Sequence, residues 1–155
     1  MPDANRFDLR TSQRISGPAM RTFLDIADQW QLSEDERLMV LGLPGRHIYF
    51  DWIYTVRTDQ DLTLPDNVLC RLSTIVSIYK ALWTLFGADH EVLEWLRGQH
   101  DAPAFGGRAP MALIVSENPD EAVLVCRYLD DFLSGAFDVG DQDVTSYADD
   151  DIVIA

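Results

Sequence analysis

The sequence has few basic residues. Lys and Arg together number 12 against 26 Asp and Glu, so the formal net charge of the 155-residue chain is -14. The imbalance is greatest at the C-terminus: residues 116–155 hold 1 basic and 11 acidic side chains (-10), residues 67–115 hold 4 of each, and residues 1–66 hold 7 and 11 (-4). An acidic surface of this kind repels nucleic acid and phospholipid headgroups and favours a basic partner.

Long apolar runs and cysteines are also scarce. There is no run of about 18 apolar residues and no apolar segment among the first twenty, so we expect neither a membrane-spanning helix nor a secretory signal, and a cytoplasmic location. The two cysteines, Cys70 and Cys126, fall on helical faces that we expect to be buried. In a reducing compartment they are interpreted as core thiols and not as a disulfide.

The sequence lacks the residue spacings that bind metals. His47, His90 and His100 do not have the spacings of a zinc site. The pair Asp141-x-Asp143 lacks the central Gly and the bidentate Glu of a calcium loop. We therefore expect no metal site.

Patterns for catalysis or nucleotide binding are missing too. Gly106-Gly107 follows no predicted strand and precedes no phosphate-binding Lys, and Ser134 has no accompanying His and acid pattern. The sequence therefore predicts no cofactor and no enzymatic activity.

What the sequence does contain is helical periodicity, which predicts an all-α fold. A long core helix is expected over residues 66–86, with Pro65 in its first turn and Gly87 as its stop. Its apolar positions recur every three or four residues. They are Leu69, Leu72, Ile75, Val76, Tyr79, Leu82, Trp83 and Phe86.

Three shorter helices and one loop follow. A helix is predicted over Asp89 to Arg97, then a loop over residues 98–109 that is held by Phe105, then a short apolar helix from Pro110. A last helix starts at Asn118 and ends at Gly135. The residues expected to be buried in the two longer helices are Val92, Leu93, Leu96, Ala122, Cys126, Leu129 and Leu133, with Val125 and Phe132 widening the second stripe.

The first 64 residues predict an arm and three helices. Residues 1–15 form a polar arm, a helix runs from Pro18 to near Gln31, and Ser33 with Glu36 forms a capping box for the second helix. A third helix opens at Pro44 and runs to about Val56. The residues expected to face inward are Met20, Phe23, Leu24, Ala27, Trp30, Leu38, Leu41, Ile48, Trp52 and Ile53.

The second and third of these helices match a helix-turn-helix unit, and two interpretations of it stay open. In one, Arg46 and His47 contact DNA, helped by the arm's basic residues Arg6, Arg10 and Arg14. In the other, the unit packs or dimerises and reads no bases, because Arg46 is the one firm positive charge among its outward residues. Exposed Tyr49 and Phe50 beside Asp51 would then suit a protein interface.

A series of motifs over about residues 68–137 carries a family resemblance. The series is Trp95-Leu96, a Gly-containing loop, Gly107-x-x-Pro110, and a helix ending Tyr128-Leu129-x-x-x-Leu133-x-Gly135. It resembles the toxin-binding domain of the Xre/MbcA/ParS-like antitoxins. The segments Trp30-x-Leu32-Ser33, Leu41-Gly42-Leu43-Pro44 and Trp52 also look like the Xre-type domain that precedes it in that family.

The resemblance implies an antitoxin whose partner is a RES-domain toxin that consumes NAD or transfers ADP-ribose. It also implies a homodimer within a toxin–antitoxin complex, and operator DNA as a further partner. The corresponding domains are an arm (1–15), a helix-turn-helix domain (16–64), a toxin-binding domain (65–137) and an acidic tail (138–155). The alternative function is a helix-turn-helix transcriptional repressor.

We predict that the tail blocks the toxin. A site that binds a dinucleotide pyrophosphate needs Arg or Lys side chains. Acidic residues of another protein can pair with these side chains and occupy the site. The tail mixes acids with apolar residues, as in segments that order on a partner; a functionless terminus is the other interpretation. Arg108 is assigned either to a partner carboxylate or to a loop-to-helix hydrogen bond. The predicted toxin-binding residues are Trp95, Phe105, Arg108, Tyr128, Tyr147, Asp149, Asp150, Asp151 and Ile152.

Overall fold

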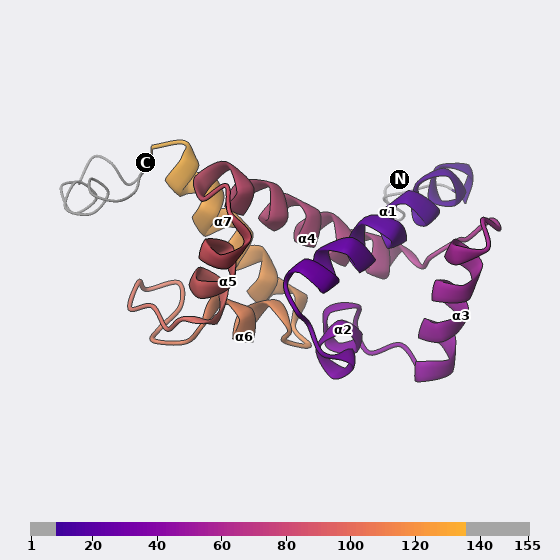
Figure 1. Cartoon of the computed structure of the whole chain (residues 1–155), viewed down its shortest axis with the longest axis horizontal. Helices are drawn as coiled ribbons and strands as arrows, with labels where there is room; N and C mark the ends of the chain where they lie inside the picture. The colour runs from indigo at the N-terminus through magenta and orange to yellow at the C-terminus, as the bar shows by residue number, and fades with distance from the viewer. Residues whose placement is uncertain (1–8, 136–155) are drawn as a thin grey trace, which may run out of the picture. The chain divides into compact units, whose positions relative to one another are not determined.

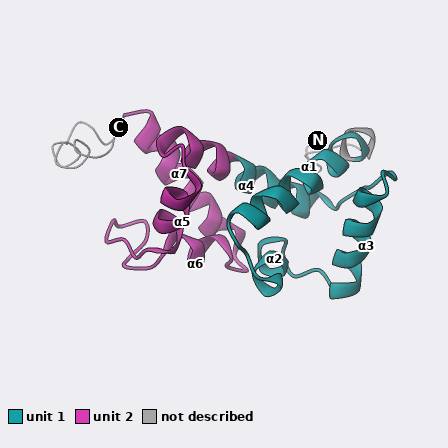
Figure 2. Cartoon of the chain, viewed as in Figure 1, with its two compact units in different colours: residues 1–76 teal, residues 77–155 magenta. Residues whose placement is uncertain are grey.

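The computed structural model describes residues 9–135, and within that range it contains seven α-helices and no strand (Figure 1). The predicted all-helical class is confirmed for these residues. The chain divides into two compact units, residues 1–76 and 77–155, which meet inside helix α4 (Figure 2). The functional bounds at residues 64 and 137 stay a prediction.

The first unit contains α1 (Leu9–Gln29), α2 (Glu34–Val40), α3 (Arg46–Arg57) and the first part of α4 (Asp66–Leu85). The predicted capping box starts α2: the Glu36 N–H donates to Ser33 Oγ over 3.1 Å, and the Ser33 N–H donates to Glu36 Oε1 over 3.0 Å. Helix α1 packs against α3. The core of this unit is apolar, and its largest fully buried side chains are Met20, Phe23, Ile26, Trp30, Leu41, Leu64, Leu72 and Ile75.

The predicted start of the first helix is wrong. Helix α1 already includes Leu9, so the second half of the predicted arm is helical, and Pro18 lies inside the helix. A proline such as Pro18 favours a helix start, because it cannot donate an N–H to the preceding turn. In α1 the turn before Pro18 is stabilised by a tertiary contact. Ser16 is fully buried, and its Oγ accepts a hydrogen bond from the Leu64 N–H over 2.9 Å. Arg6 lies outside the described residues.

The predicted inward face of α3 is wrong at two positions, Ile48 and Tyr49. Tyr49, expected to face outward, is buried with 2% exposed, whereas Ile48, expected to face inward, is 40% exposed. The helix begins at Arg46, two residues after Pro44, and its buried residues are Tyr49 and Val56. These two positions are seven residues apart, which places them on one face. Trp52 and Ile53 are half-buried.

The second unit contains the rest of α4, α5 (Asp89–Arg97), α6 (Pro110–Ile114) and α7 (Pro119–Leu133). The bounds of α5 are those predicted. Helix α6 packs against both α5 and α7, and Asn118 caps α7 by accepting the Asp120 N–H over 3.0 Å. The core consists of Ile78, Ala81, Leu82, Val92, Leu96, Phe105, Met111, Leu113, Ile114, Val125 and Leu129.

Several residues expected in the core are less buried. Trp83 is 37% exposed and Leu133 is 41% exposed, and Cys70 and Cys126 are half-buried cysteines that form no disulfide with each other. Ala122 and Leu93 are half-buried. In α7 the buried residues are Val125 and Leu129, so the buried stripe is narrower than the apolar stripe in the sequence.

By length and composition alone, α4 is apolar enough to cross a membrane. This helix contains no uninterrupted apolar run of about 18 residues, because Arg71 and Lys80 lie within it. Its residues Leu69, Leu72 and Leu82 are buried in the described structure, as in the core helix of a compact protein.

Replacing Ser16 by Ala should lower the free energy of unfolding by about 1–3 kcal/mol, because the buried Leu64 N–H loses its acceptor. Urea unfolding followed by circular dichroism measures the change. The matched control is Ser73→Ala at an exposed position of α4, which should change stability by less than about 0.5 kcal/mol. Equal stability of the two variants would contradict this role of Ser16.

Candidate functional site

An aromatic cluster in the second unit joins three elements. Phe105 from the loop of residues 98–109 is 1% exposed and meets Tyr128 of α7 edge-on, with ring centroids 4.8 Å apart. It also meets Trp95 of α5 edge-on at 5.6 Å. Trp95 and Tyr128 are near-parallel at 6.5 Å, and Phe132 continues the series along α7. Such edge-to-face contacts add to the apolar burial of Phe105 in holding the loop against two helices.

Hydrogen bonds close the loop at its base. The Gly107 N–H donates to the His100 carbonyl over 2.8 Å, and the His100 N–H donates to the Arg108 carbonyl over 3.3 Å. Inside the loop, the Phe105 and Gly106 N–H groups both donate to the Ala102 carbonyl, over 2.9 and 3.0 Å. The loop is therefore held in one conformation by its own backbone as well as by its Phe105 anchor.

Residue His100 is part of this cluster, which the sequence analysis missed. Its ring lies 5.2 Å from the Trp95 ring and 5.6 Å from the Phe105 ring, and its Nε2 is 2.9 Å from the Trp95 carbonyl oxygen. A carbonyl only accepts, so Nε2 carries the proton in this contact. The sequence places His100 two residues after the helix-ending Gly98, and no local pattern there indicates its aromatic contacts.

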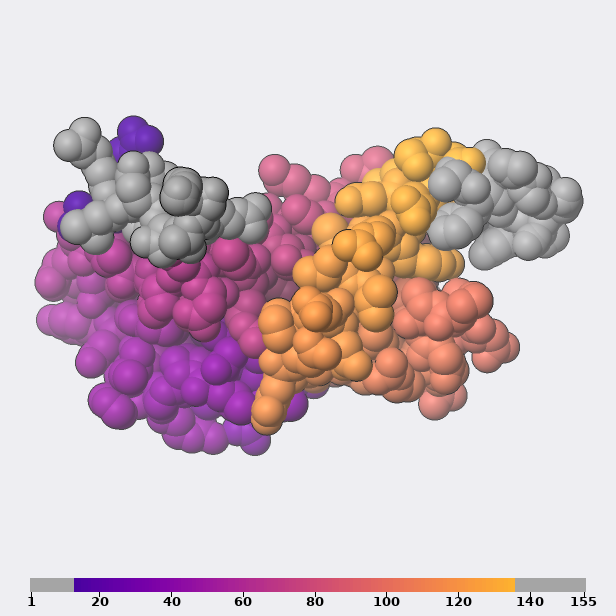
Figure 3. Space-filling view, turned by 180° about the vertical axis from the view of Figure 1, so that it is seen from behind, coloured from indigo at the N-terminus to yellow at the C-terminus, as the bar shows by residue number. Residues whose placement is uncertain are grey.

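The outer side of the loop presents bare backbone and one cation. Gly106 and Gly107 have φ values of 58° and 85°, and a Cβ added at either would meet no atom within 4 Å. The left-handed backbone explains the glycines here, because L side chains rarely adopt it. Beside them the Arg108 side chain is 52% exposed. In the view from behind, the segment around residue 100 (salmon) lies beside the segment that contains α6 and α7 (orange) (Figure 3).

The structure brings together three of the predicted toxin-binding residues, namely Trp95, Phe105 and Tyr128. Arg108 is adjacent: its Nη1 lies 3.8 Å from Glu121 Oε2 on α7, and its Nε donates to the Phe105 carbonyl over 3.4 Å. It thus makes a loop-to-helix contact and still presents half of its side chain to a partner. The other predicted toxin-binding residues, Tyr147, Asp149, Asp150, Asp151 and Ile152, lie outside the described residues.

The two candidate DNA contacts, Arg46 and His47, are exposed in the first turn of α3. Arg46 forms ion pairs with Glu34 and with Asp35 of α2, the latter with 2.7 Å between Nη2 and Oδ1. Two carboxylates therefore compete with any phosphate or base for this guanidinium. The DNA-binding assignment stays a prediction.

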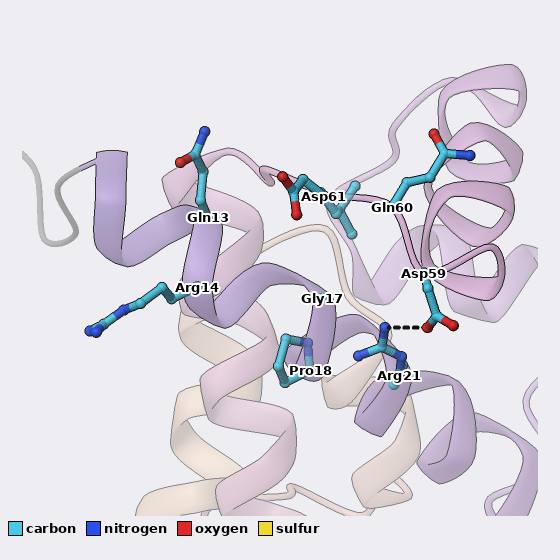
Figure 4. Close-up of a pocket in the computed structure, with 9 residues that line it drawn as sticks. Gln13, Arg14, Gly17, Pro18, Arg21, Asp59, Gln60 and Asp61 are labelled. Atoms are coloured by element: carbon cyan, nitrogen blue, oxygen red, sulfur yellow. Dashed lines mark hydrogen bonds and ion pairs between the residues drawn. The ribbon is translucent and has the colours of Figure 1, made fainter.

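A hollow of about 410 Å³ lies in the first unit between α1 and the connection from α3 to α4 (Figure 4). Arg21 and Asp59 form an ion pair there at 3.2 Å, and Asp61 also lines it. Small-molecule sites are mostly apolar with a few convergent polar groups, whereas the lining here is mainly polar, with exposed side chains. We assign no ligand to it. Among the described residues, no group of three or more His, Cys, Asp or Glu could hold a metal ion.

Similarity to known proteins covers the part of the chain that contains the aromatic cluster. The family model of the antitoxin Xre/MbcA/ParS C-terminal toxin-binding domain matches residues 81–135, which include the whole aromatic cluster. An uncharacterized protein, y4oB of Sinorhizobium fredii (strain NBRC 101917 / NGR234), is 34% identical over 111 residues, or 72% of this chain and 81% of the relative. The chain belongs to the Xre/MbcA/ParS antitoxin family, as its motifs indicated.

Replacing Phe105 by Ala should lower the free energy of unfolding by about 3–5 kcal/mol, because the substitution leaves a cavity under Trp95 and Tyr128. Chemical unfolding followed by Trp fluorescence measures this change in the free energy of unfolding. Leu124→Ala is the matched control, because Leu124 is apolar but 41% exposed on α7. It should cost less than about 1 kcal/mol. A Phe105→Ala protein as stable as this control would show that Phe105 does not anchor the loop.

The Cys126 thiol should react slowly with iodoacetamide. Burial, and after it the Asp130 carboxylate with Oδ2 3.9 Å from Sγ, raise the pKa of Cys126 above its ordinary value. The reactive thiolate therefore forms only at higher pH than in the unfolded chain. Asp130→Asn should lower this pKa and speed labelling at pH 8, as measured by mass spectrometry. Labelling as fast as in urea-unfolded protein would contradict the assignment.

Proposed function

We propose that this protein is the antitoxin of a toxin–antitoxin pair and that it neutralises a RES-domain toxin in the cytoplasm. It does so by covering the site at which the toxin consumes NAD or transfers ADP-ribose. The family resemblance further implies a homodimer within the toxin–antitoxin complex. The observation that carries the proposal is the Phe105-anchored loop of residues 98–109, which lies inside the segment matched by the toxin-binding family model.

The geometry of the loop supports a docking role. A contact surface that is already ordered loses little conformational entropy on binding. The loop has this property because hydrogen bonds between His100, Gly107 and Arg108 close it and Phe105 fixes it to α5 and α7. The open space beside Gly106 and Gly107 lets another backbone approach closely.

The charge of the chain supports the choice of toxin. A toxin that binds a dinucleotide must neutralise a pyrophosphate, so we expect Arg or Lys in its site. Residues 116–155 hold 1 basic and 11 acidic side chains and are suited to such a site. We assign the blocking contacts to Asp149, Asp150 and Asp151, with Tyr147 and Ile152 as apolar anchors. This assignment comes from the sequence of the tail.

Autoregulation by DNA binding is the secondary role, with the helix-turn-helix repressor as the alternative function. It requires Arg46 to leave Glu34 and Asp35 for the DNA. The other exposed side chains at that end of α3 offer little for reading base edges. They are His47, Ile48, Phe50 and Asp51. We therefore place inhibition of the toxin first.

Deleting residues 140–155 should abolish inhibition of the toxin while leaving complex formation measurable, because the proposed docking loop and the proposed blocking segment are separate. NAD consumption by the purified toxin measures inhibition, and gel filtration measures the complex. A tail of the same length with Asp149, Asp150 and Asp151 changed to Asn is the matched control for charge. Full inhibition by the truncated protein would remove the tail from the mechanism.

Reversing the charge of the loop should weaken the complex. Arg108→Glu is expected to reduce the affinity for the toxin at least tenfold, about 1.4 kcal/mol, because it places a like charge opposite the carboxylate that we expect on the partner. Titration calorimetry measures the affinity. Lys80→Glu changes the net charge equally at an exposed site on α4 and should change the affinity less than threefold. Equal losses for both variants would indicate a general charge effect and no docking by the loop.

A further inference from the structure

His100 lies where the loop of residues 98–109 closes. Its backbone N–H donates to the Arg108 carbonyl over 3.3 Å, and its own carbonyl accepts the Gly107 N–H over 2.8 Å. Both backbone groups of this one residue therefore bond to the far end of the loop. Any displacement of His100 also displaces Gly107 and Arg108, which belong to the proposed docking surface.

The side chain of His100 ties this closing point to the end of α5. The last four carbonyls of a helix lack a partner within it. In α5 the Glu94 carbonyl accepts the Gly98 N–H, and the Trp95 carbonyl accepts from His100 Nε2 over 2.9 Å. A histidine near the end of a helix can cap its last carbonyls in this way. A directional bond thus fastens the base of the loop to the helix.

The imidazole ring of His100 also packs against the aromatic residues that hold the loop. Its centroid lies 5.2 Å from the Trp95 ring and 5.6 Å from the Phe105 ring. Phe105 is 1% exposed and fixes the loop to α5 and α7. His100 therefore restrains the loop at its base, while Phe105 restrains it further along.

These contacts explain why a histidine suits position 100. A phenylalanine would keep the ring contacts but has no N–H to donate to Trp95, and a glutamine would keep a donor but has no ring. Imidazole supplies a flat ring and a ring N–H together. Among the described residues, His100 belongs to no group of three or more His, Cys, Asp or Glu that could hold a metal ion.

We propose that His100 is the positioning residue of the docking loop, which sets the affinity for the toxin by holding Gly107 and Arg108 in the orientation that the toxin binds. This inference rests on the proposed function, in which the loop docks the toxin. His100 acts through the two residues that it bonds and needs no contact with the toxin itself. A loop that must become ordered during binding loses conformational entropy, so loosening its base weakens the complex.

Amide hydrogen exchange of the free full-length protein, followed by NMR, tests the positioning step without toxin. His100→Ala should speed exchange of the Gly107 amide at least tenfold, because the base of the loop then opens more often. His100→Gln should recover part of the protection, because its amide can still donate to the Trp95 carbonyl. Exchange of the Leu129 amide in α7 should stay as in the wild type, which excludes loss of the whole fold.

Titration calorimetry with the purified toxin tests the functional step. His100→Ala should raise the dissociation constant at least tenfold at an unchanged stoichiometry, and His100→Gln should recover part of the affinity. A protein that is merely destabilised would instead show a smaller fraction of binding molecules. His90→Ala is the matched control, because His90 is an exposed histidine in the first turn of α5. It should leave Gly107 exchange unchanged and change the affinity less than threefold.

Three results would overturn the proposal. The first is Gly107 exchange that is as slow in His100→Ala as in the wild type, which would show that His100 does not hold the loop. The second is a complex that Arg108→Glu weakens and His100→Ala does not, in which case the loop docks the toxin and only the positioning role is wrong. The third is a complex that neither variant weakens, in which case the loop does not dock the toxin and the proposed function of the loop falls as well.

Discussion

Burial of one aromatic side chain, Phe105, is the interaction on which the candidate site depends. Residues 98–109 contain no helix or strand, and backbone hydrogen bonds order the loop from within. Phe105 fixes the loop to the rest of the unit by packing against Trp95 of α5 and Tyr128 of α7. Because the anchor points inward, the opposite side of the loop is left with glycine backbone and Arg108. A packing constraint in the core thus determines what the surface presents.

Ion pairs within the first unit engage several of the arginines that could otherwise contact DNA. Arg37 pairs with Asp28, Arg21 with Asp59, and Arg46 with the acids of α2. Exposed pairs of this kind add little stability. Their effect is to reduce the positive potential available to nucleic acid. An acidic protein with its cations engaged in this way is better suited to binding a basic protein than to binding DNA.

Local signals in the sequence were sufficient for much of the fold. The capping box of Ser33 and Glu36 and the bounds of α5 are set by residues within a few positions of one another, and both predictions are confirmed. The errors arose where tertiary contacts decide. Pro18 is tolerated inside α1, where Ser16 is tied to Leu64 across 48 positions of sequence. Which side of α3 is buried depends on its packing against α1. Periodicity alone does not distinguish Ile48 from Tyr49.

The candidate site was predicted from motifs more than from periodicity. Trp95 and Tyr128 belong to the motifs that resemble the antitoxin family, and Phe105 is the predicted anchor of the loop between them. The structure brings all three within contact distance. His100 was missed because no local pattern signals a histidine packed between two aromatic rings. The tail residues lie outside the described range, so their role is still a prediction from composition.

Hydrogen exchange of the antitoxin with and without its toxin tests the central claim most directly. Toxin binding should slow exchange of the Gly106, Gly107 and Arg108 amides and of amides in the tail, while exchange in α2 and α3 should change little. Protection confined to α2 and α3, with the loop of residues 98–109 exchanging as fast as in the free protein, would contradict it.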